Sequence, residues 1–434
     1  MKPLHVGLIG FGTVGKGVFD VLRRNEEEIT RRAGRPIRIT RVATRTLDRT
    51  RGIEGVTVTD DTAAGVRHRD VDIVCELIGG VEPARTLVLD AIAGGKHVVT
   101  ANKALLAQHG NEIFAAASAK GVMVAFEAAV AGGVPIIKAL REGLTANRIE
   151  WIAGIINGTS NFILSQMRET GASFADVLKE AQARGYAEAD PTFDVEGIDA
   201  AHKLSIMSAI AFGVPMQYEK AYAEGISKLM REDIRYAEEL GYRIKLLGIT
   251  RRAKNGIELR VHPTLIPRKR LIANVEGAMN AVLVKGDAVG PTLYYGAGAG
   301  TEPTASAIIA DLVDVTRMHT ADPNHRVPHL AFQPDQLTDV PFLPIGEVET
   351  SYYLRMRVDD KPGVLADITR ILADRDISID AMIQKEPSEG EFQTDIILLT
   401  HRSIEKRVVD AIAKIEALPT VRGKIVRIRL EQLA

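Results

Sequence analysis

Two lysines stand in sequence contexts that could support proton transfer. Lys203 ends the segment 186–203 and lies four residues after Asp199, so both side chains would project from one face of a helix. Such a pair is ordinarily a solvent-exposed ion pair worth about 0.3–0.5 kcal/mol. The following run, 204–214, is apolar on nearly every side, which predicts a buried helix whose charges face a cavity. A partly buried lysine beside a carboxylate suits a proton donor.

Lys103 is the second lysine, and it lies directly after a predicted strand. It ends Thr100-Ala101-Asn102-Lys103, directly after the apolar run at 97–99. Ligands of doubly wound parallel sheets collect beyond the carboxyl ends of the strands, and this segment would lie there. The pattern therefore predicts that Lys103 contacts a bound ligand.

A glycine-rich turn near the N-terminus predicts a nucleotide site. It joins a strand expected at His5–Ile9 directly to a helix. In this motif the glycines permit a tight turn, close approach of the backbone to a pyrophosphate, and close packing of the helix on the strand. The N–H groups at the helix start then bind the phosphates. Alone, such a motif can be mere turn chemistry, but strand, turn and helix occur here in the required order. The residues are Gly10, Phe11, Gly12, Thr13, Val14 and Gly15.

The end of the second predicted strand, Arg38–Ala43, bears on the choice of coenzyme. NAD-selective sites usually place an acidic residue there, which binds the ribose hydroxyls. This sequence instead has Arg45, whose guanidinium would suit the 2′-phosphate of NADP. A solvated surface arginine is the alternative. The sequence thus favours NADP(H) and leaves NAD(H) open.

Short apolar runs and amphipathic helical stretches alternate from residue 4 to about 127, which predicts a doubly wound parallel α/β sheet. A mixed α/β region follows. Five prolines between 321 and 350 then mark a spacer. The remaining residues follow the order strand, helix, strand, strand, helix, strand, which is a ferredoxin-like unit. The expected domains are 1–134 plus about 301–320, 135–300, the spacer 321–350, and 351–434.

Composition excludes several classes of partner. The 55 basic and 56 acidic residues give a formal charge of −1, so no electrostatic footprint for nucleic acid is visible. The longest uncharged run, 204–218, is too short to cross a bilayer. Cys75 is the single cysteine, which fits a reducing compartment. We expect a cytoplasmic protein that binds neither nucleic acid nor membrane.

Taken together, these segments resemble homoserine dehydrogenase of the single-function bacterial type with a C-terminal ACT domain. The segment 188–203 is highly specific and shows no departure from the family pattern. The aspartokinase half of bifunctional relatives is absent. The segments that carry the resemblance are 10–15, 100–103, 126–135, 157–161, 188–203 and 298–304.

The resemblance implies a reaction and roles for individual residues. The reaction is the reversible NAD(P)-dependent conversion of L-aspartate 4-semialdehyde to L-homoserine, in threonine, methionine and isoleucine biosynthesis. Lys203 would donate the proton, Lys103 would contact cofactor and substrate oxygen, and Glu188 would hold the substrate ammonium. Two ammonium groups near the carbonyl oxygen suit the negative charge that grows there as hydride arrives. The implied substrate residues are Lys103, Glu188, Asp194 and Asp199; Arg45, Thr100, Lys103, Gly300 and Glu302 join the glycine turn at the cofactor.

The resemblance further suggests an alkali-metal ion and self-association. Glu127 and the carbonyls of Val130, Gly132 and Val134 would bind sodium, and carbonyls of a glycine-rich turn suit a hard cation. Without the resemblance, Glu127 would be read as a strand-end carboxylate. The family's central region, here 135–300, is catalytic and dimerises through a sheet, so a homodimer or homotetramer is expected.

The C-terminal unit contains a loop, 359–365, that resembles the effector loop of ACT domains. Gly363 would let a free amino acid approach the backbone there. Since homoserine is a precursor of threonine, the resemblance points to threonine as a feedback inhibitor. A domain that only pairs subunits is the alternative, because fold alone does not fix function.

Two other functions compete with this one. A nucleotide- and amino-acid-responsive regulator would share the overall organisation, but no DNA-binding helix pair or basic face is visible. Another reductase of the same fold, acting on a different amino-acid aldehyde or keto acid, is the alternative among enzymes. The segment 188–203 separates the two enzymes, because a generic reductase does not need it.

Overall fold

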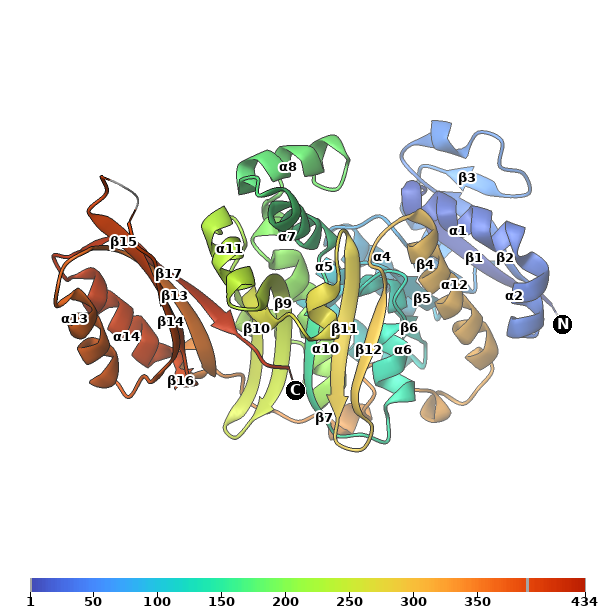
Figure 1. The fold of residues 1–434 in the computed structure, drawn as a ribbon. Helices are drawn as coiled ribbons and strands as arrows, with labels where there is room; N and C mark the ends of the chain where they lie inside the picture. Colours follow the sequence, from blue (N-terminus) through green and yellow to red (C-terminus); the bar gives the residue numbers. More distant parts are fainter. Residues whose placement is uncertain (1, 388–389, 434) are drawn as a thin grey trace. The chain divides into compact units, whose positions relative to one another are not determined.

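The computed structural model describes residues 2–387 and 390–433, and the chain divides into two compact units (Figure 1). Each unit is assembled from three separate stretches of chain. The first comprises Met1–Gly158, Asp199–Ala221 and Ala278–Val340, and the second comprises Thr159–Ile198, Tyr222–Gly277 and Pro341–Ala434.

Six parallel strands form a sheet in the first unit. Their order is β3-β2-β1-β4-β5-β6, so strands are added on opposite sides of β1. The predicted doubly wound parallel sheet is confirmed. Apolar side chains of β1 and β2 pack with those of the helices α1 (Thr13–Arg24) and α12 (Thr301–Met318) in one core. The strands are β1 (Leu4–Ile9), β2 (Ile37–Ala43), β3 (Thr57–Thr59), β4 (Ile73–Glu76), β5 (His97–Thr100) and β6 (Val124–Ala125).

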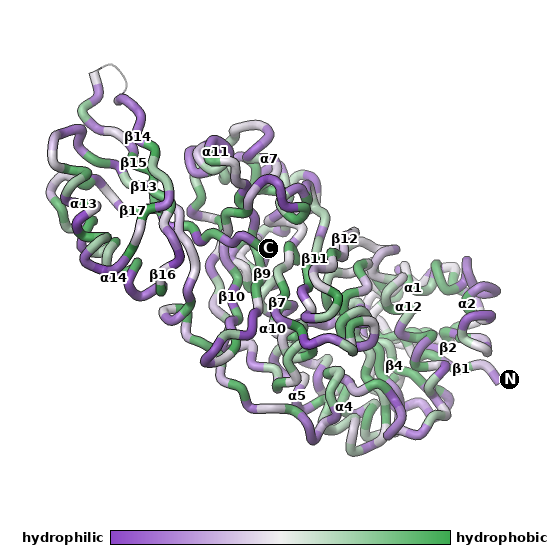
Figure 2. Tube along the Cα trace, turned by 60° about the horizontal axis from the view of Figure 1, so that its bottom comes forward, coloured by the Kyte–Doolittle hydropathy of each residue, from purple (hydrophilic) through white to green (hydrophobic). Residues whose placement is uncertain are grey.

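The helical spacing of residues 13–32 predicts one helix, but the structure has two helices there. α1 ends at Arg24, and α2 covers Glu26–Ala33. Asn25 between them has φ −109° and ψ 21°. Asparagine competes with helical hydrogen bonding through its side chain, and the three glutamates that follow favour a new helix N-terminus. α2 is the more hydrophilic of the two helices (Figure 2).

The first unit also contains three neighbouring antiparallel strands and the long helix α10 (Ile198–Phe212). β11 (Met279–Gly286) lies between β7 (Ile149–Ile155) and β12 (Gly290–Ala297). Every residue of α10 after its first is buried, as the apolar run predicted. Four further helices belong to this unit: α3 (Thr62–Arg67), α4 (Ala84–Ala93), α5 (Lys103–Lys120) and α6 (Ile136–Lys138).

The second unit is organised around strands in the order β9-β10-β17-β13-β15-β14. Its C-terminal part has the predicted βαββαβ order, and the last residues of β17 pair in parallel with β10. β9 was not predicted, because its arginines and lysine interrupt the apolar pattern. The strands are β8 (Tyr222–Ala223), β9 (Tyr242–Ala253), β10 (Gly256–Pro267), β13 (Glu349–Asp359), β14 (Ile379–Gln384), β15 (Gln393–Thr400), β16 (Ser403–Ile404) and β17 (Val421–Leu430); the helices are α7 (Gly158–Thr170), α8 (Phe174–Ala183), α9 (Thr192–Val195), α11 (Arg231–Glu239), α13 (Val364–Ala373) and α14 (Glu405–Glu416).

The proline-rich spacer makes backbone hydrogen bonds with residues of each unit. In the first unit, the N–H of Thr338 donates to the carbonyl of Gly213 at 2.8 Å. In the second, the N–H of Ile257 donates to the carbonyl of Pro341 at 2.9 Å. The spacer is therefore an ordered connection.

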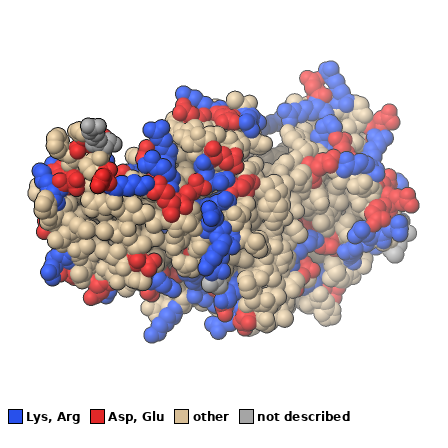
Figure 3. Space-filling view, in the orientation of Figure 1, with Lys and Arg blue, Asp and Glu red and all other residues tan. Residues whose placement is uncertain are grey.

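Surface charge of both signs is spread over the face shown in Figure 3, in keeping with the near-zero net charge. Within 2–387 and 390–433, no helix has the length and apolar character that crossing a membrane requires.

Candidate active site

Lys103 is positioned by the turn between β5 and α5. The apolar pattern predicts a helix over 111–120, but α5 begins earlier, at Lys103, because Asn102 caps it. The Asn102 side-chain oxygen accepts the N–H of Leu105 at 3.1 Å, and its amide donates to the carbonyl of Gly80 at 2.6 Å. A capped helix start satisfies otherwise unpaired N–H groups. Lys103 therefore stands in the first turn of α5, just past the carboxyl end of β5.

Glu76, at the end of β4, organises the same edge of the sheet. Its carboxylate accepts the Thr100 hydroxyl at 2.6 Å and the N–H groups of Ile78 and Gly79 at 2.9 and 3.2 Å. Burial raises the pKa of this carboxyl group. Sequence reasoning assigned Glu76 no role, although an acid inside an apolar strand was the available signal. The Thr100 hydroxyl is thus engaged inside the protein, and it also accepts the N–H of Asn102.

Asp199 joins the two lysines that the sequence singled out. Its carboxylate lies 2.7 Å from Nζ of Lys203 and 2.8 Å from Nζ of Lys103. The Asn157 side chain donates to it at 2.9 Å, and Lys203 also donates to the carbonyl of Ile156 at 2.8 Å. The i,i+4 pair is buried, so the surface alternative is wrong. Asn157 lies in a segment that carried the resemblance, but no role had been assigned to it.

The electrostatics of this cluster favour a charged carboxylate. Burial raises the pKa of Asp199, but the ammonium groups of Lys203 and Lys103 outweigh burial and hold that pKa well below its usual range. The Lys203 side chain is 11% exposed and that of Lys103 is 34% exposed. One ammonium group is therefore enclosed and the other reaches solvent, while a single carboxylate fixes both.

Two predicted substrate residues belong to the second unit. Glu188 is exposed, and its carbonyl oxygen accepts the Gln182 side chain at 3.0 Å. Asp194 is half-buried, and its carbonyl oxygen accepts the Ser160 hydroxyl at 3.0 Å. Their role at the substrate stays a prediction.

The glycine turn fits a dinucleotide phosphate. Gly10 has φ +98°, and a Cβ there would lie 2.8 Å from the Leu77 carbonyl oxygen. A Cβ on Gly15 would lie 2.2 Å from the Gly10 carbonyl oxygen. Both positions therefore require glycine. Gly12 directly precedes α1, and its surroundings are different. A Cβ on Gly12 would lie 3.7 Å from the nearest atom, which leaves room for a ligand.

Arginines lie on the β2 side of this turn. Arg45 is exposed just after β2, where the sequence placed it. Sequence reasoning missed Arg49, whose Nη1 is the atom 3.7 Å from the Cβ position on Gly12. Arg49 and Lys16 line a cleft of about 380 Å³. This cleft can hold an anion beside the turn.

The start of α12 contains the other predicted cofactor residues. Gly300 precedes the helix with φ +120°, and Glu302 forms an ion pair with Arg24 of α1 at 2.7 Å. A Cβ on Gly17 would lie 2.6 Å from the Thr301 methyl group. α1 and α12 therefore pack closely, which brings the 298–304 segment to the helix that follows the glycine turn.

Glu127 lies in a short turn whose groups fit a bound cation. Its two carboxylate oxygens accept the N–H groups of Ile137 and Lys138 at 2.9 and 2.8 Å. Val130 and Gly132 are buried, and no backbone hydrogen bond given for the described chain ends on either carbonyl. Buried carbonyls normally have a partner. The Val134 carbonyl accepts one N–H, which leaves it a second lone pair.

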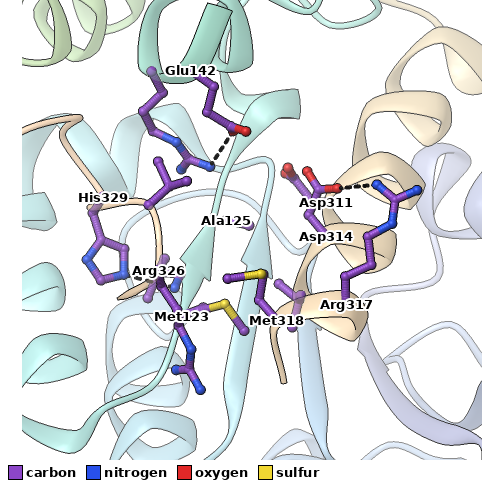
Figure 4. A pocket seen from close by; sticks show the side chains of 13 residues that line it. Met123, Ala125, Glu142, Asp311, Asp314, Arg317, Met318, Arg326 and His329 are labelled. Carbon is purple, nitrogen blue, oxygen red and sulfur yellow. Dashed lines mark hydrogen bonds and ion pairs between the residues drawn. The ribbon is translucent and has the colours of Figure 1, made fainter. Parts of the chain in front are cut away.

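A second buried acid, Asp311 of α12, lies next to Glu127. It accepts the Glu127 N–H at 2.7 Å. Burial, and then the charge of Asp311, raise the pKa of Glu127 to about 7; burial raises the pKa of Asp311 to about 6. Asp311 and Asp314 face a pocket of about 180 Å³ (Figure 4). A cation would favour ionisation of both buried acids.

The predicted effector loop is open in the structure. Gly363 precedes α13 with φ +92°, and no atom lies within 4 Å of a Cβ built on it. Nearby, Arg422 donates twice to the Asp359 carboxylate, at 2.8 and 2.7 Å. The loop therefore has a fixed base and an unobstructed glycine.

Comparison with known proteins covers the whole chain. The homoserine dehydrogenase family model matches residues 135–313, the homoserine dehydrogenase NAD-binding domain matches 10–127, and the ACT domain matches 352–420. Homoserine dehydrogenases of Pseudomonas aeruginosa and Neisseria gonorrhoeae are 63% and 59% identical, each over 100% of both chains. The crystal structure of a homoserine dehydrogenase from Thiobacillus denitrificans matches with a TM-score of 0.96. Its sequence is 74% identical, and the match covers 100% of this chain and 99% of that one. The chain belongs to the homoserine dehydrogenase family, NAD(P)-dependent oxidoreductases that act on a CH–OH group.

Proposed function

We propose that the chain catalyses the reversible reduction of L-aspartate 4-semialdehyde to L-homoserine, with Lys203 as the proton donor. One observation carries this proposal, which is the buried Asp199 carboxylate between two lysine ammonium groups. Reduction of an aldehyde places negative charge on its oxygen, and the alcohol forms only when that oxygen gains a proton. The cluster provides positive charge and a proton in one place.

The different exposure of the lysines gives them different roles. Lys203 is enclosed and held by Asp199 and the Ile156 carbonyl, so its direction is fixed. Lys103 is more exposed and can contact both cofactor and substrate oxygen. Asp199 holds both ammonium groups in place through its two ion pairs. Lys203 donates that proton, and Lys103 stabilises the charge.

The glycine turn, with Thr100, Gly300 and Glu302, would hold the nicotinamide coenzyme. The coenzyme supplies the hydride for the reduction. We favour NADP(H) over NAD(H), because Arg45 follows β2 and Arg49 lies over Gly12. Each guanidinium can pair with a 2′-phosphate.

Substrate recognition needs carboxylates for the ammonium group of the amino acid. We assign this role to Glu188, with Asp194 and Asp199 as the other acids of the substrate site. Glu188 is exposed and in no ion pair given for the described residues, so its charge is available. Glu127, with the carbonyls of Val130, Gly132 and Val134, would hold sodium as a structural ion.

Regulation and assembly complete the proposal. We assign residues 1–134 with about 301–320 to cofactor binding, 135–300 to catalysis and dimerisation, 321–350 to the spacer, and 351–434 to regulation. Threonine would bind at Gly363 and inhibit a homodimer or homotetramer. The open loop at Gly363 supports an amino-acid ligand.

NADPH oxidation with L-aspartate 4-semialdehyde tests the function, with Lys203→Ala as the variant. Removal of a general acid should lower kcat by more than about 10²-fold while coenzyme binding persists. Lys120→Ala, at the exposed end of α5, is the control and should behave as wild type. Near-normal kcat in folded Lys203→Ala would overturn the assignment of the proton donor. A preference for another amino-acid aldehyde or keto acid would overturn the assignment of the substrate.

A further inference from the structure

Glu76 is a fully buried carboxylate to which the proposed function gives no role. It ends β4, which lies between β1 and β5 in the six-stranded sheet (Figure 1). The residue is 0% exposed, and no ion pair within residues 2–387 and 390–433 includes it. Buried carboxylates in proteins are usually paired with a positive charge. Glu76 has its hydrogen bonds, but its charge has no counterpart in the described part of the chain.

The hydrogen bonds of Glu76 favour the ionised form of its side chain. The N–H groups of Ile78 and Gly79 both donate to Oε1, and the Thr100 hydroxyl donates to Oε2. The Thr100 oxygen in turn accepts the N–H of Asn102 at 3.0 Å, so its own proton is directed to the carboxylate. Three donors on one carboxylate stabilise its negative charge. A positive charge nearby would stabilise it further.

The surroundings of Glu76 place it at the edge of the sheet that would receive the coenzyme. On one side, Glu76 pairs in register with the residue of β1 that directly precedes the glycine turn. A Cβ on Gly10 of that turn would lie 2.8 Å from the carbonyl oxygen of Leu77, the residue after Glu76. On the other side, Glu76 pairs in register with Thr100, which precedes Lys103 by three residues. The carboxylate therefore lies between the glycine turn and the lysine assigned to the coenzyme.

The two halves of a dinucleotide bind on opposite sides of the first strand in a doubly wound sheet. The adenosine half binds near the end of β2, so the nicotinamide half falls on the side of β4 and β5. The nicotinamide ring is a cation in the oxidised coenzyme and neutral in the reduced coenzyme. The cluster of Lys103, Asp199 and Lys203 has two positive charges against one negative charge, and this excess disfavours a cationic ring. A further carboxylate at the same edge of the sheet offsets that repulsion.

We propose that Glu76 is the counter-charge of the oxidised nicotinamide ring and selectively strengthens binding of the oxidised coenzyme. This inference rests on the proposed coenzyme site. Glu76 acts across the protein interior and not by contact, because its oxygens are engaged by Ile78, Gly79 and Thr100. The interior screens charges less than water does, so a buried carboxylate still acts on a cation several ångströms away. Since only the oxidised ring is charged, Glu76 distinguishes NADP⁺ from NADPH.

Fluorescence titration of the full-length protein measures the Kd for NADPH directly and that for NADP⁺ by competition, and Glu76→Gln is the variant. Glutamine keeps the shape and the hydrogen bonds of the side chain. Its oxygen can accept the N–H groups of Ile78 and Gly79, and its amide can donate to the second lone pair of the Thr100 hydroxyl. We expect the Kd for NADP⁺ to rise at least about fivefold relative to that for NADPH, because the variant removes one charge–charge interaction.

Two further variants separate charge from shape. Glu76→Asp keeps the charge, so the ratio of the two dissociation constants should stay near that of the wild type even if both constants change. Asp233→Asn removes a buried carboxylate of the second unit, paired with Arg355, and should also leave the ratio unchanged.

Equal changes of both constants in Glu76→Gln would overturn the proposal, because Glu76 would then act only through the shape of the turn. A change of the ratio in Glu76→Asp as large as that in Glu76→Gln would overturn it for the same reason. Failure of the wild type to bind either coenzyme is a different outcome, which would overturn the proposed function and this inference with it.

Discussion

Asp199→Asn is the most informative single change, because it keeps the shape of the side chain and removes the charge that holds two ammonium groups. Two charge-assisted contacts, at 2.7 and 2.8 Å, lose their ionic character. Breaking a buried ion pair costs about 3–5 kcal/mol. The two ammonium groups would then lack the counter-charge that holds them in place.

The expected kinetic result is a fall in kcat of at least about 10²-fold, since a positioned acid contributes roughly 10²–10⁴-fold. The Kd for the coenzyme should change little, because the coenzyme is held by other residues. Asp233→Asn is the matched control. Asp233 is a fully buried carboxylate of the second unit, paired with Arg355 at 2.6 Å. It should lose comparable stability and keep kcat near wild type.

The difference in stability between the wild type and Asp199→Asn also depends on pH in a defined direction. Because the folded-state pKa of Asp199 lies below its ordinary value of about 3.9, its charge stabilises the fold above that value and loses this effect only at lower pH. The melting temperatures of wild type and variant should differ at neutral pH and converge in acid. If folded Asp199→Asn loses no more activity than Asp233→Asn, the catalytic role of the cluster is refuted.

Three further predictions concern ligands. Arg45→Ala and Arg49→Ala should each raise the KM for NADPH more than that for NADH, by a factor corresponding to about 1.5–3 kcal/mol. Equal effects on both coenzymes would show that the arginine does not bind the 2′-phosphate. Gly363→Val should raise the threonine concentration for half-inhibition at least about tenfold, because a side chain would block the open loop; indifference of the wild type to millimolar threonine would exclude this effector. Sodium chloride should raise the melting temperature above that in choline chloride at about pH 8 but not at about pH 5, because burial raises the pKa of Glu127 from 4.5 to about 7. The stability contributed by the protonated acid is lost as pH rises through that value, and a bound cation would offset the loss by pairing with the ionised carboxylate. Equal melting temperatures in the two salts at about pH 8 would argue against a bound metal ion.

The sequence predicted those parts of the fold that depend on local pattern. Alternating apolar runs indicated the parallel sheet, and the apolar run after Lys203 indicated the buried α10. Prediction was wrong where one residue changed the local balance. Asn25 divides a helical stretch in two, and Asn102 starts α5 earlier than its apolar pattern suggests. β9 was missed because its charged side chains find partners, such as Glu276 for Arg243, that lie far along the chain.

In the active-site cluster, too, the contact within one helix could be predicted from the sequence, and the contact between distant segments could not. The spacing of Asp199 and Lys203 is a property of one helix, so four residues of separation were enough to pair them. Lys103 was identified only by its place after a strand, and no spacing could indicate that it shares a carboxylate with Lys203. That contact requires the fold to bring the start of α5 to α10, which is a consequence of packing within the first unit.

Buried acids mark the limit of sequence reasoning most clearly. Glu76 and Asp311 each occur within an apolar stretch, where the pattern alone indicates only a strand or a helix. Each accepts backbone N–H groups, from Ile78 and Glu127 respectively, and backbone donors have no sequence signature. Since an unpaired buried carboxylate is costly, such an acid predicts that a partner exists without naming it. Acids inside predicted strands and buried helices are therefore a usable signal, because here they mark both the edge of the sheet that carries Lys103 and the turn that carries Glu127.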